Sequence, residues 1–231
     1  MLKRVYHYAA LFLEKRPWGI QLLYHSIRHY KLYELMEALI VAFIFAMVIR
    51  TFFFQAFKIP SESMMPTLHV GDRLFVNKMV YYFRPPEVGE IVVFKTPPII
   101  YDARKPIYIK RVTGLPGDEV AIRADPNRRD GAGQLYINGK RVAHPAILGI
   151  DYTVRVEDLR TNRPKIYTVE KVPEGEIYVF GDNSAHSLDS RWWGGVPLEN
   201  VKGKAFLRWW PPNRFGPVSY THLTLPTKRI V

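Results

Sequence analysis

The chain of 231 residues carries a formal net charge of +12 and is 48% hydrophobic, which is enough apolar material for one main domain with a buried core. It contains no cysteine, so disulfide bonds and thiolate zinc sites are excluded. A basic chain can bind nucleic acid or anionic lipid. The sequence lacks zinc-finger spacing, aromatic RNA-binding boxes and glycine-rich phosphate loops, so we expect no nucleic-acid partner.

The N-terminal segment mixes basic and apolar side chains and leads into the most apolar stretch of the chain. Its early apolar run, residues 5–13, is short and no small-residue cleavage site follows it, so we do not interpret it as a cleaved signal peptide. Residues 18–35 show near-helical spacing, which fits either a helix on the membrane surface or a solvated helix leading into a span. We assign residues 1–37 to a cytoplasmic segment.

Residues 38–57 predict a single transmembrane helix. They hold 20 positions with one charge, Arg50, and about 20 apolar residues cross the hydrocarbon core of a bilayer. A helix buried in a soluble core is the alternative. Only Lys58 closely follows the span, so the positive-inside rule predicts a cytoplasmic N-terminus and an outer C-terminal domain. The basic residues before the span are Lys3, Arg4, Lys15, Arg16, Arg28 and Lys31.

Beyond the span the chain changes to short runs rich in Val, Ile, Tyr and Phe, which favour strands. Asn138-Gly139 lies between two alternating runs and is a typical hairpin turn. We therefore predict a mostly β fold, with an antiparallel β catalytic domain over residues 58–217 behind the single helix. The predicted strands lie within residues 72–82, 90–95, 107–114, 134–142, 176–182 and 203–210.

Two parts of this domain differ from the strand pattern. Residues 119–171 are richer in Arg, Asp, Asn and Gly, which indicates a smaller inserted subdomain. Residues 218–231 continue no pattern, and they are either a disordered end or a foreign sequence joined to the terminus. We assign that tail no function.

The residue types point away from metal and histidine chemistry. No spacing of the seven histidines predicts a metal site, and we expect neither a metal nor a cofactor. A Ser-His-Asp triad is possible in composition, but no nucleophile elbow is present. His186 beside Ser187 is the one suggestive histidine.

Lysine is the alternative base. To act near neutral pH, a lysine must lose about three units of pKa, and burial among apolar groups can supply such a shift. Lys110 lies in the apolar run 107–112, and strand alternation places it on one face with Tyr108 and Val112. Ile109 and Arg111 lie on the other face. From the pattern alone, an outward-pointing lysine is the simpler interpretation.

Three ordered stretches resemble the type I signal peptidase family, the bacterial leader peptidases. They are IPSESMMPTLHVGDRLFV at 59–76, YIKRVTGLPGD at 108–118 and GDNSAHSLDSRWWG at 181–194. The resemblance covers about residues 37–215. It implies a membrane-bound serine endopeptidase that removes signal peptides from exported preproteins after an A-x-A-like site. The implied setting is the plasma (inner) membrane, with the catalytic domain on the outer or periplasmic side.

The resemblance also implies partners and site residues. Preprotein signal peptides and membrane phospholipid are the expected partners, close to the protein-export channel. The implied nucleophile is Ser63 and the implied general base is Lys110. The Ser61 side chain and the Ser63 backbone N–H would form the oxyanion hole, and Ser187 would orient the lysine. Asp189 and Arg191 would form a structural ion pair near the site, and Asp182 and Asn183 would shape it.

One position departs from the family pattern. Glu62 stands where many members have glycine, and a required positive φ would strain the turn. Two other functions remain open: a maturation protease of narrow substrate range, and a non-enzymatic, membrane-tethered β adaptor. Several apolar side chains would contact either the membrane or the core, namely Phe75, Met79, Trp192, Trp193, Trp209 and Trp210.

Overall fold

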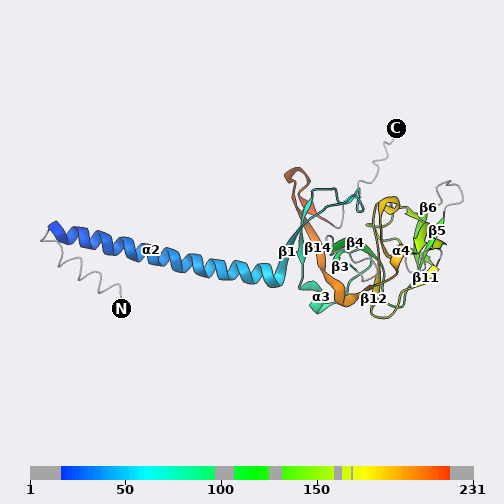
Figure 1. The fold of residues 1–231 in the computed structure, drawn as a ribbon, viewed down its shortest axis with the longest axis horizontal. Coiled ribbons are helices and arrows are strands. Elements are labelled where there is room, and N and C mark those ends of the chain that lie inside the picture. The colour runs from blue at the N-terminus through cyan, green and yellow to red at the C-terminus, as the bar shows by residue number, and fades with distance from the viewer. Residues whose placement is uncertain (1–16, 97–106, 125–131, 159–162, 168, 219–231) are drawn as a thin grey trace, which may run out of the picture. The chain divides into compact units, whose positions relative to one another are not determined.

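The computed structural model describes residues 17–96, 107–124, 132–158, 163–167 and 169–218, and the chain divides into two compact units (Figure 1). The first unit, Met1–Thr51, is helical where it is described. The second unit, Phe52–Val231, is built mainly from antiparallel strands. The predicted mostly β fold behind an N-terminal apolar helix is confirmed.

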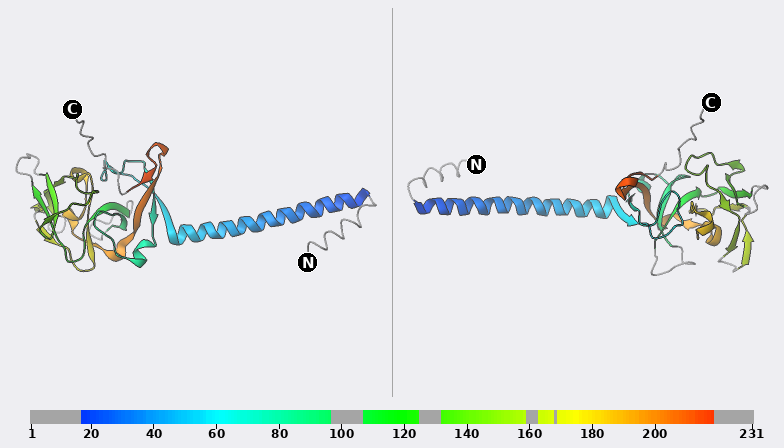
Figure 2. Two further views of the ribbon diagram at one scale, coloured as in Figure 1. Left: turned by 180° about the vertical axis from the view of Figure 1, so that it is seen from behind. Right: turned by 90° about the horizontal axis from the view of Figure 1, so that it is seen from above.

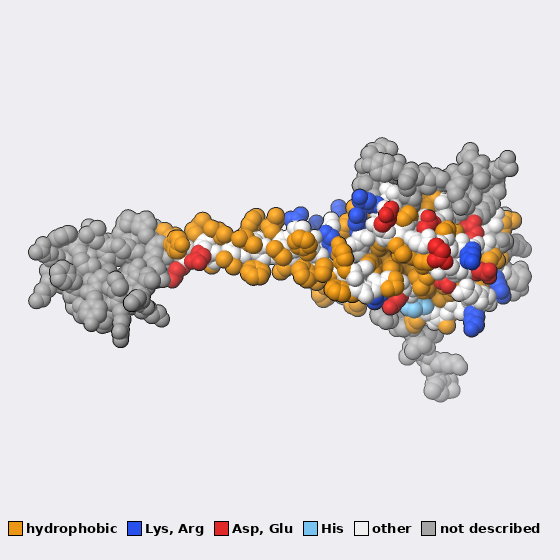
Figure 3. All heavy atoms as spheres, turned by 90° about the horizontal axis from the view of Figure 1, so that it is seen from below, with side chains coloured by type: hydrophobic (Ala, Val, Ile, Leu, Met, Phe, Trp, Pro, Cys, Tyr) orange, Lys and Arg blue, Asp and Glu red, His pale blue; other side chains and the backbone are white. Residues whose placement is uncertain are grey.

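Helix α2 spans Pro17–Val48 and continues into a π-helical turn, η1, at Ile49–Phe53. Within this stretch, Lys31–Phe53 is long enough and apolar enough to cross a membrane, and none of it is buried. Figure 3 shows apolar side chains along the helix on the face in view. An exposed helix that is apolar over a full span length is suited to lipid rather than to water.

The predicted span, residues 38–57, extends too far at its C-terminal end. The helical conformation ends at Phe53, and Phe54–Lys58 forms strand β1. β1 pairs with the next strand from Phe54 onward, so its backbone groups already belong to a sheet. Because the apolar run crosses the helix–strand boundary without a change in composition, hydropathy alone places the end of the helix too late.

The main sheet has eight strands in the order β1-β2-β14-β3-β4-β12-β13, with β15 paired to β14, and every pairing is antiparallel. Strand β4 lies between β3 and β12 and coincides with the predicted strand at 107–114. The remaining bounds are β2 Arg73–Asn77, β3 Ile91–Lys95, β12 Glu176–Phe180, β13 Val196–Pro197, β14 Val201–Trp210 and β15 Gly216–Pro217.

The predicted strand at 72–82 is too long. β2 ends at Asn77, whose side-chain oxygen accepts hydrogen bonds from the N–H groups of Met79 (2.9 Å) and Val80 (3.2 Å). The chain therefore turns and forms a short helix, α3, at Val80–Phe83. The other short helices are η3 Ser184–His186, α4 Ser190–Trp193, η4 Leu198–Asn200 and η5 Pro212–Arg214.

A second sheet is formed by the segment for which an insert is predicted, and Figure 2 shows it on one side of the β domain. Its order is β11-β5-β6-β7, with β8 paired to β6, and β9 and β10 form a separate hairpin. The predicted turn is present between β6 and β7, with φ of 51° at Asn138 and 76° at Gly139. The bounds are β5 Glu119–Ala124, β6 Ala132–Ile137, β7 Lys140–Arg141, β8 Tyr152–Thr153, β9 Arg155–Asp158, β10 Arg163–Ile166 and β11 Val169–Lys171.

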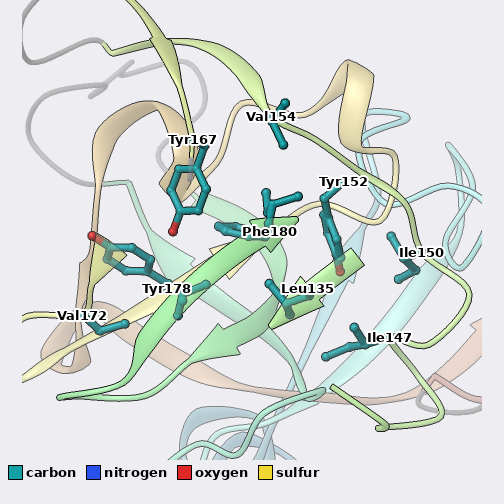
Figure 4. Close-up of a cluster of buried hydrophobic side chains, with 11 residues drawn as sticks. Leu135, Ile147, Ile150, Tyr152, Val154, Tyr167, Val172, Tyr178 and Phe180 are labelled. Carbon is teal, nitrogen blue, oxygen red and sulfur yellow. The ribbon is translucent and has the colours of Figure 1, made fainter. Parts of the chain in front are cut away.

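The two sheets share a core. Phe180 of β12 makes edge contacts with Tyr152 (ring centroids 5.4 Å apart) and Tyr167 (5.7 Å), both from the second-sheet segment (Figure 4). Leu135 and Ile147 pack in the same cluster. The insert is therefore joined to the main sheet through β12.

The predicted tail, residues 218–231, starts one residue too early, because Val218 still belongs to the β domain. Val218 is fully buried, belongs to the core beside Met64 and Leu68, and donates its backbone N–H to the carbonyl of Phe206. Residues 219–231 lie outside the described part of the chain.

Candidate active site

The segment at residues 58–68, KIPSESMMPTL, mixes polar and apolar side chains because it forms a loop that is anchored in the core. The loop between β1 and β2 closes on itself, because Ile59 donates its N–H to Asp72 (2.8 Å) and Gly71 donates to Ile59 (2.9 Å). Met64 and Leu68 are fully buried and anchor the loop in the core of the main sheet. The serines lie just before this anchor, so the loop presents them from a fixed base.

The predicted nucleophile and base are in contact. Lys110 Nζ lies 2.6 Å from Ser63 Oγ, and Lys110 also donates to the Ile109 carbonyl at 3.1 Å. Lys110 is 2% exposed and Ser63 is 8% exposed. The Ser61 hydroxyl oxygen lies 3.3 Å from Ser63 Oγ. The lysine therefore points into the site. The simpler interpretation of the strand pattern, an outward-pointing lysine, is wrong.

Burial changes the acidity of this lysine. Desolvation lowers the pKa of Lys110 to about 8, while the negative charges of Asp189 and Asp182 oppose that change by raising the pKa. A group with this pKa is neutral in about one molecule in ten at pH 7. Lys110 can therefore accept a proton from a neighbouring hydroxyl near neutral pH.

A buried ion pair adjoins the lysine, and the sequence did not reveal it. Arg111 donates to both carboxylate oxygens of Asp182, at 2.8 and 2.6 Å, and Thr67 donates to the same carboxylate at 2.5 Å. Arg111 also donates to the Gly89 carbonyl at 2.7 Å. The network joins the serine loop, the lysine strand and the end of β12. Strand alternation placed Arg111 opposite Lys110, but it did not identify Asp182 as its partner.

The third sequence stretch holds a second buried pair. Arg191 and Asp189 are paired at 2.7 Å with both side chains fully buried, as the resemblance implied. Asp189 also accepts the Gly181 N–H at 2.9 Å, and Arg191 donates to the Ser184 carbonyl at 2.9 Å. The pair therefore organises the turn that carries residues 181–191 rather than contacting Ser63 directly.

Asn183 connects this turn to the serine loop. Its N–H donates to the Ser63 carbonyl at 3.0 Å, and its side-chain amide donates to the Glu62 carbonyl at 3.1 Å. At Gly181, a Cβ atom would lie only 2.5 Å from the Ser63 carbonyl oxygen and 2.1 Å from Ser187 Oγ. Only glycine permits this close approach.

Ser187 lies beside Gly181, and among the described residues its hydroxyl forms no hydrogen bond with Lys110. Its side chain is 4% exposed, and its hydroxyl makes no hydrogen bond within the described part of the chain. Its orienting role stays a prediction.

Glu62 is accommodated without strain. Among the described residues other than glycine, Asn138 alone has a positive φ, so Glu62 does not need a glycine conformation. Its side chain is exposed.

The alternative histidine and the aromatic residues can also be placed. His186 is exposed on η3, so the contact to Ser63 comes from Lys110 and not from this histidine. Trp193 is 4% exposed in the core near Tyr108, whereas Trp210 is 46% exposed. Phe75, Met79, Trp192 and Trp209 are half-buried. No three His, Asp or Glu side chains in the described ranges lie close enough to hold a metal ion.

An antiparallel β domain that places a serine hydroxyl 2.6 Å from a buried lysine has an arrangement that a serine hydrolase can use. Residues 32–210 match the family described as "Signal peptidase, peptidase S26". The chain belongs to this family, and it is a serine peptidase.

The relatives agree with this assignment. The chain is 40% identical over 188 residues to a probable signal peptidase I of Synechocystis sp., covering 79% of this chain and 75% of that protein. It is 37% identical over 188 residues to a signal peptidase I of Leptolyngbya laminosa, covering 80% and 83%. It is 38% identical over 178 residues to a probable chloroplastic thylakoidal processing peptidase of Arabidopsis thaliana, covering 75% and 42%. A crystal structure of a signal peptidase I from Enterococcus faecalis V583 is 29% identical, covers 52% of this chain and 97% of that one, and has a TM-score of 0.34.

Proposed function

We propose that this protein is a membrane-anchored endopeptidase that removes N-terminal signal peptides from exported preproteins after an A-x-A-like site. Ser63 is the nucleophile and Lys110 is the general base. The observation that carries the proposal is the 2.6 Å contact between Ser63 Oγ and the buried Lys110 Nζ. Relatives named signal peptidase I support signal peptides as the substrates.

The chemistry follows from the protonation state of the lysine. A serine hydroxyl is a weak nucleophile near pH 7 and needs a base within hydrogen-bond reach. Neutral Lys110 accepts the hydroxyl proton while Ser63 Oγ bonds to the scissile carbonyl carbon. The ammonium then gives a proton to the leaving amine as the C–N bond breaks. Water, deprotonated by Lys110, hydrolyses the acyl-enzyme by the same route.

The developing oxyanion needs donors that are already in place. The Ser61 hydroxyl and the Ser63 backbone N–H are the donors, and within the described chain that N–H donates to no other backbone carbonyl. Removing one such donor in a known protease costs about 3–4 kcal/mol of transition-state stabilisation. Ser61→Ala should therefore lower kcat far more than it raises KM.

The membrane setting follows from the helix and its flanks. Residues 31–53 cross the bilayer once, the N-terminal segment is cytoplasmic, and the β domain from residue 54 to 218 lies on the outer side. Phospholipid surrounds the span, and the export channel supplies the precursors. The plasma membrane is the proposed location, with the thylakoid membrane as the alternative that the Arabidopsis relative raises.

The deciding experiment is processing of a precursor with an A-x-A site by the purified, detergent-solubilised full chain. Wild type and the exposed-lysine control Lys140→Ala should cleave at that boundary, whereas Ser63→Ala and Lys110→Ala should not. Equal cleavage by all four proteins would reject the assignment of Ser63 and Lys110. No cleavage by folded wild type would favour the adaptor function.

The absence of cysteine makes the topology testable. Single cysteines at exposed Leu148 and at residue 15 can be labelled in intact cells with a membrane-impermeant maleimide. We expect labelling at Leu148 and protection at residue 15, and the reverse pattern would overturn the proposed orientation.

A further inference from the structure

The serine loop, residues 59–72, is closed at its far end by a buried carboxylate. Asp72 is 1% exposed and accepts a hydrogen bond from the N–H of His69 at 2.9 Å. It also accepts a hydrogen bond from Arg214 of η5 at 3.0 Å. The segment that follows β14 therefore contacts the loop that carries Ser63.

A second arginine reaches the middle of the serine loop from β14. Arg208 is 7% exposed, and its backbone lies between β2 and β15 in the main sheet. Its Nη1 donates to the Thr67 carbonyl at 3.1 Å, and its Nε donates to the Arg214 carbonyl. Because its strand is paired on both sides, Arg208 holds the Thr67 carbonyl from a fixed position.

Thr67 is thereby held from two directions. Its hydroxyl donates to Asp182 at 2.5 Å, and Asp182 is paired with Arg111, the neighbour of Lys110 in β4. Its carbonyl accepts the hydrogen bond from Arg208. One network thus ties the side chain of Thr67 to the lysine strand, and the other ties its backbone to β14.

The turn between Ser63 and Thr67 is short and internally bonded. Met64 follows Ser63 and Leu68 follows Thr67, and the Leu68 N–H donates to the Met64 carbonyl at 2.9 Å. Both of these apolar side chains are fully buried. A displacement at Thr67 is therefore passed on to Ser63, because the turn has no slack to absorb it.

Folding stability alone does not account for Arg208. Burial lowers the pKa of its guanidinium, the positive charge of Arg214 lowers it further, and Asp72 raises it. The Asp72 carboxylate lies 3.8 Å from Arg208 and is shared with Arg214. A buried cation whose counterion is distant and shared contributes little to stability, so the contact with the Thr67 carbonyl is the better explanation for this side chain.

We propose that Arg208 is a positioning residue for the peptidase reaction: by holding the Thr67 carbonyl, it keeps the Ser63 hydroxyl against Lys110 and the serine loop closed over the lysine. The proposal rests on the proposed function, in which Ser63 and Lys110 carry the chemistry. Arg208 lies outside the sequence stretches at 59–76, 108–118 and 181–194. Within the described chain it donates to Thr67 and Arg214 and to neither catalytic residue, so it acts through the loop.

The acidity of Lys110 depends on the position of the loop. Lys110 is 2% exposed, and desolvation lowers its pKa to about 8. Because Ser63 Oγ lies 2.6 Å from Lys110 Nζ, the loop is part of what excludes water from this nitrogen. If the loop loosens, water returns, the desolvation weakens, and the pKa of Lys110 rises towards its ordinary value of 10.5.

The test compares pH–rate profiles of the detergent-solubilised full chain on a peptide with an A-x-A site. Arg208→Met removes the donors and keeps an unbranched side chain. We expect the midpoint of kcat/KM to rise by about one pH unit, which lowers kcat/KM about tenfold at pH 7. Most of the loss should appear in kcat rather than in KM, because the change acts on the protonation of the base.

Two further variants separate positioning from general effects. Arg208→Lys keeps a donor for the Thr67 carbonyl and should restore most of kcat/KM, with a midpoint near pH 8. Arg84 is the matched control, because it donates to the Pro85 carbonyl at 2.9 Å and pairs with the Glu90 carboxylate, both outside the serine loop. Arg84→Met should leave the midpoint unchanged.

Hydrogen exchange follows the loop without catalysis. The amides of residues 59–72, measured by mass spectrometry, should exchange about three to ten times faster in Arg208→Met than in wild type, as expected when one hydrogen bond is lost. They should exchange at the wild-type rate in Arg84→Met. Peptides from residues 132–158 of the insert provide an internal reference.

Each other result overturns the proposal or its premise. An unchanged midpoint in Arg208→Met, or loop exchange at the wild-type rate, would reject positioning through Thr67. An Arg208→Met protein that no longer folds would assign Arg208 to stability alone. If Ser63→Ala and Lys110→Ala cleave like wild type, the proposed function fails instead, and the exchange of the loop still tests the contact between Arg208 and Thr67.

Discussion

Two buried regions of the β domain are built in opposite ways. Between the sheets, side chains such as Leu135, Ile147 and Phe180 form an apolar cluster. Behind Ser63, the buried side chains are Lys110, Arg111, Asp182, Asp189 and Arg191, most of them charged. The first region stabilises the fold through buried apolar area. The second places charges in a low-dielectric site, which lowers stability unless each charge is well paired. The contrast indicates that the apolar region supplies stability, and that holding the buried charges behind Ser63 lowers it.

The largest expected loss of stability comes from removing an aromatic side chain from the apolar cluster. Phe180→Ala should lower the free energy of unfolding by about 3–5 kcal/mol, because it leaves a cavity next to Tyr152 and Tyr167. Thermal or urea unfolding of the detergent-solubilised protein measures it. Phe215→Ala, at a position 65% exposed, is the control and should change little. A small effect at Phe180 would mean that the insert does not share a core with β12.

A comparable loss should follow from unpairing a charge in the polar region. Asp182→Asn leaves Arg111 buried without its counterion, which destabilises proteins by about 3–5 kcal/mol. The exposed carboxylate of Glu87, which pairs with Arg84 at 3.4 Å, is the control, and Glu87→Gln should change the stability by less than about 1 kcal/mol. Unfolding curves measure both variants. If the two curves coincided, the buried charge pair would be no more important for stability than the exposed one.

Replacing Lys110 should raise the free energy of unfolding, in contrast to the two changes above. The folded-state pKa of Lys110 is about 8 against an ordinary value of 10.5, so protonated Lys110 opposes folding by about 3 kcal/mol below pH 8. Lys110→Met should therefore stabilise the protein at pH 7, and the gain should shrink as the pH rises from 8 towards 10.5. Melting temperatures across this range measure the trend, with Lys140→Met as the exposed control. A pH-independent difference would contradict the lowered pKa.

A smaller effect is expected at Thr67. Thr67→Val removes the hydrogen bond to Asp182 and should cost about 1–3 kcal/mol of stability, with a fall in kcat as the serine loop loses its tie to Arg111. Thr67→Ser keeps the hydroxyl and should restore kcat. Steady-state kinetics on a peptide substrate measure kcat and KM for both variants. An unchanged kcat in Thr67→Val, with a change in KM alone, would mean that other contacts hold the serine loop.

The mildest test changes only the solvent. Because Lys110 must be neutral to accept the Ser63 proton, kcat/KM should rise with pH and level off above a midpoint near pH 8. A pH–rate profile measures the midpoint. A flat profile between pH 6 and 9 would exclude Lys110 as the base that limits the free enzyme.

Much of the fold and site was readable from the sequence because local patterns carry them. The alternation around Lys110 predicted its strand, and Asn138-Gly139 predicted its hairpin turn. The end of the helix was missed because Phe52, Phe53 and Phe54 are equally apolar on both sides of the boundary. The end of β2 was missed because the side chain of Asn77 redirects the backbone, a local bond that hydropathy does not register.

Long-range pairing was the part that the sequence could not supply. Arg111 and Asp182 are 71 positions apart, and nothing in either segment names the other as its partner. Whether Lys110 pointed inward or outward also depended on where the loop of Ser63 would lie. Only the resemblance brought Ser63 and Lys110 together before the fold was seen, and it did not pair Arg111 with Asp182.

The shared core has a consequence for anyone seeking a minimal peptidase. Tyr178 and Phe180 of β12 pack against the insert, and the residues that follow, Asp182 and Asn183, hold the serine loop. Joining Asp118 directly to Val172 would strip the covering from one face of β12 and leave its aromatic rings in water. We expect the shortened chain to lose catalysis, because β12, which it still contains, would no longer be packed against the insert.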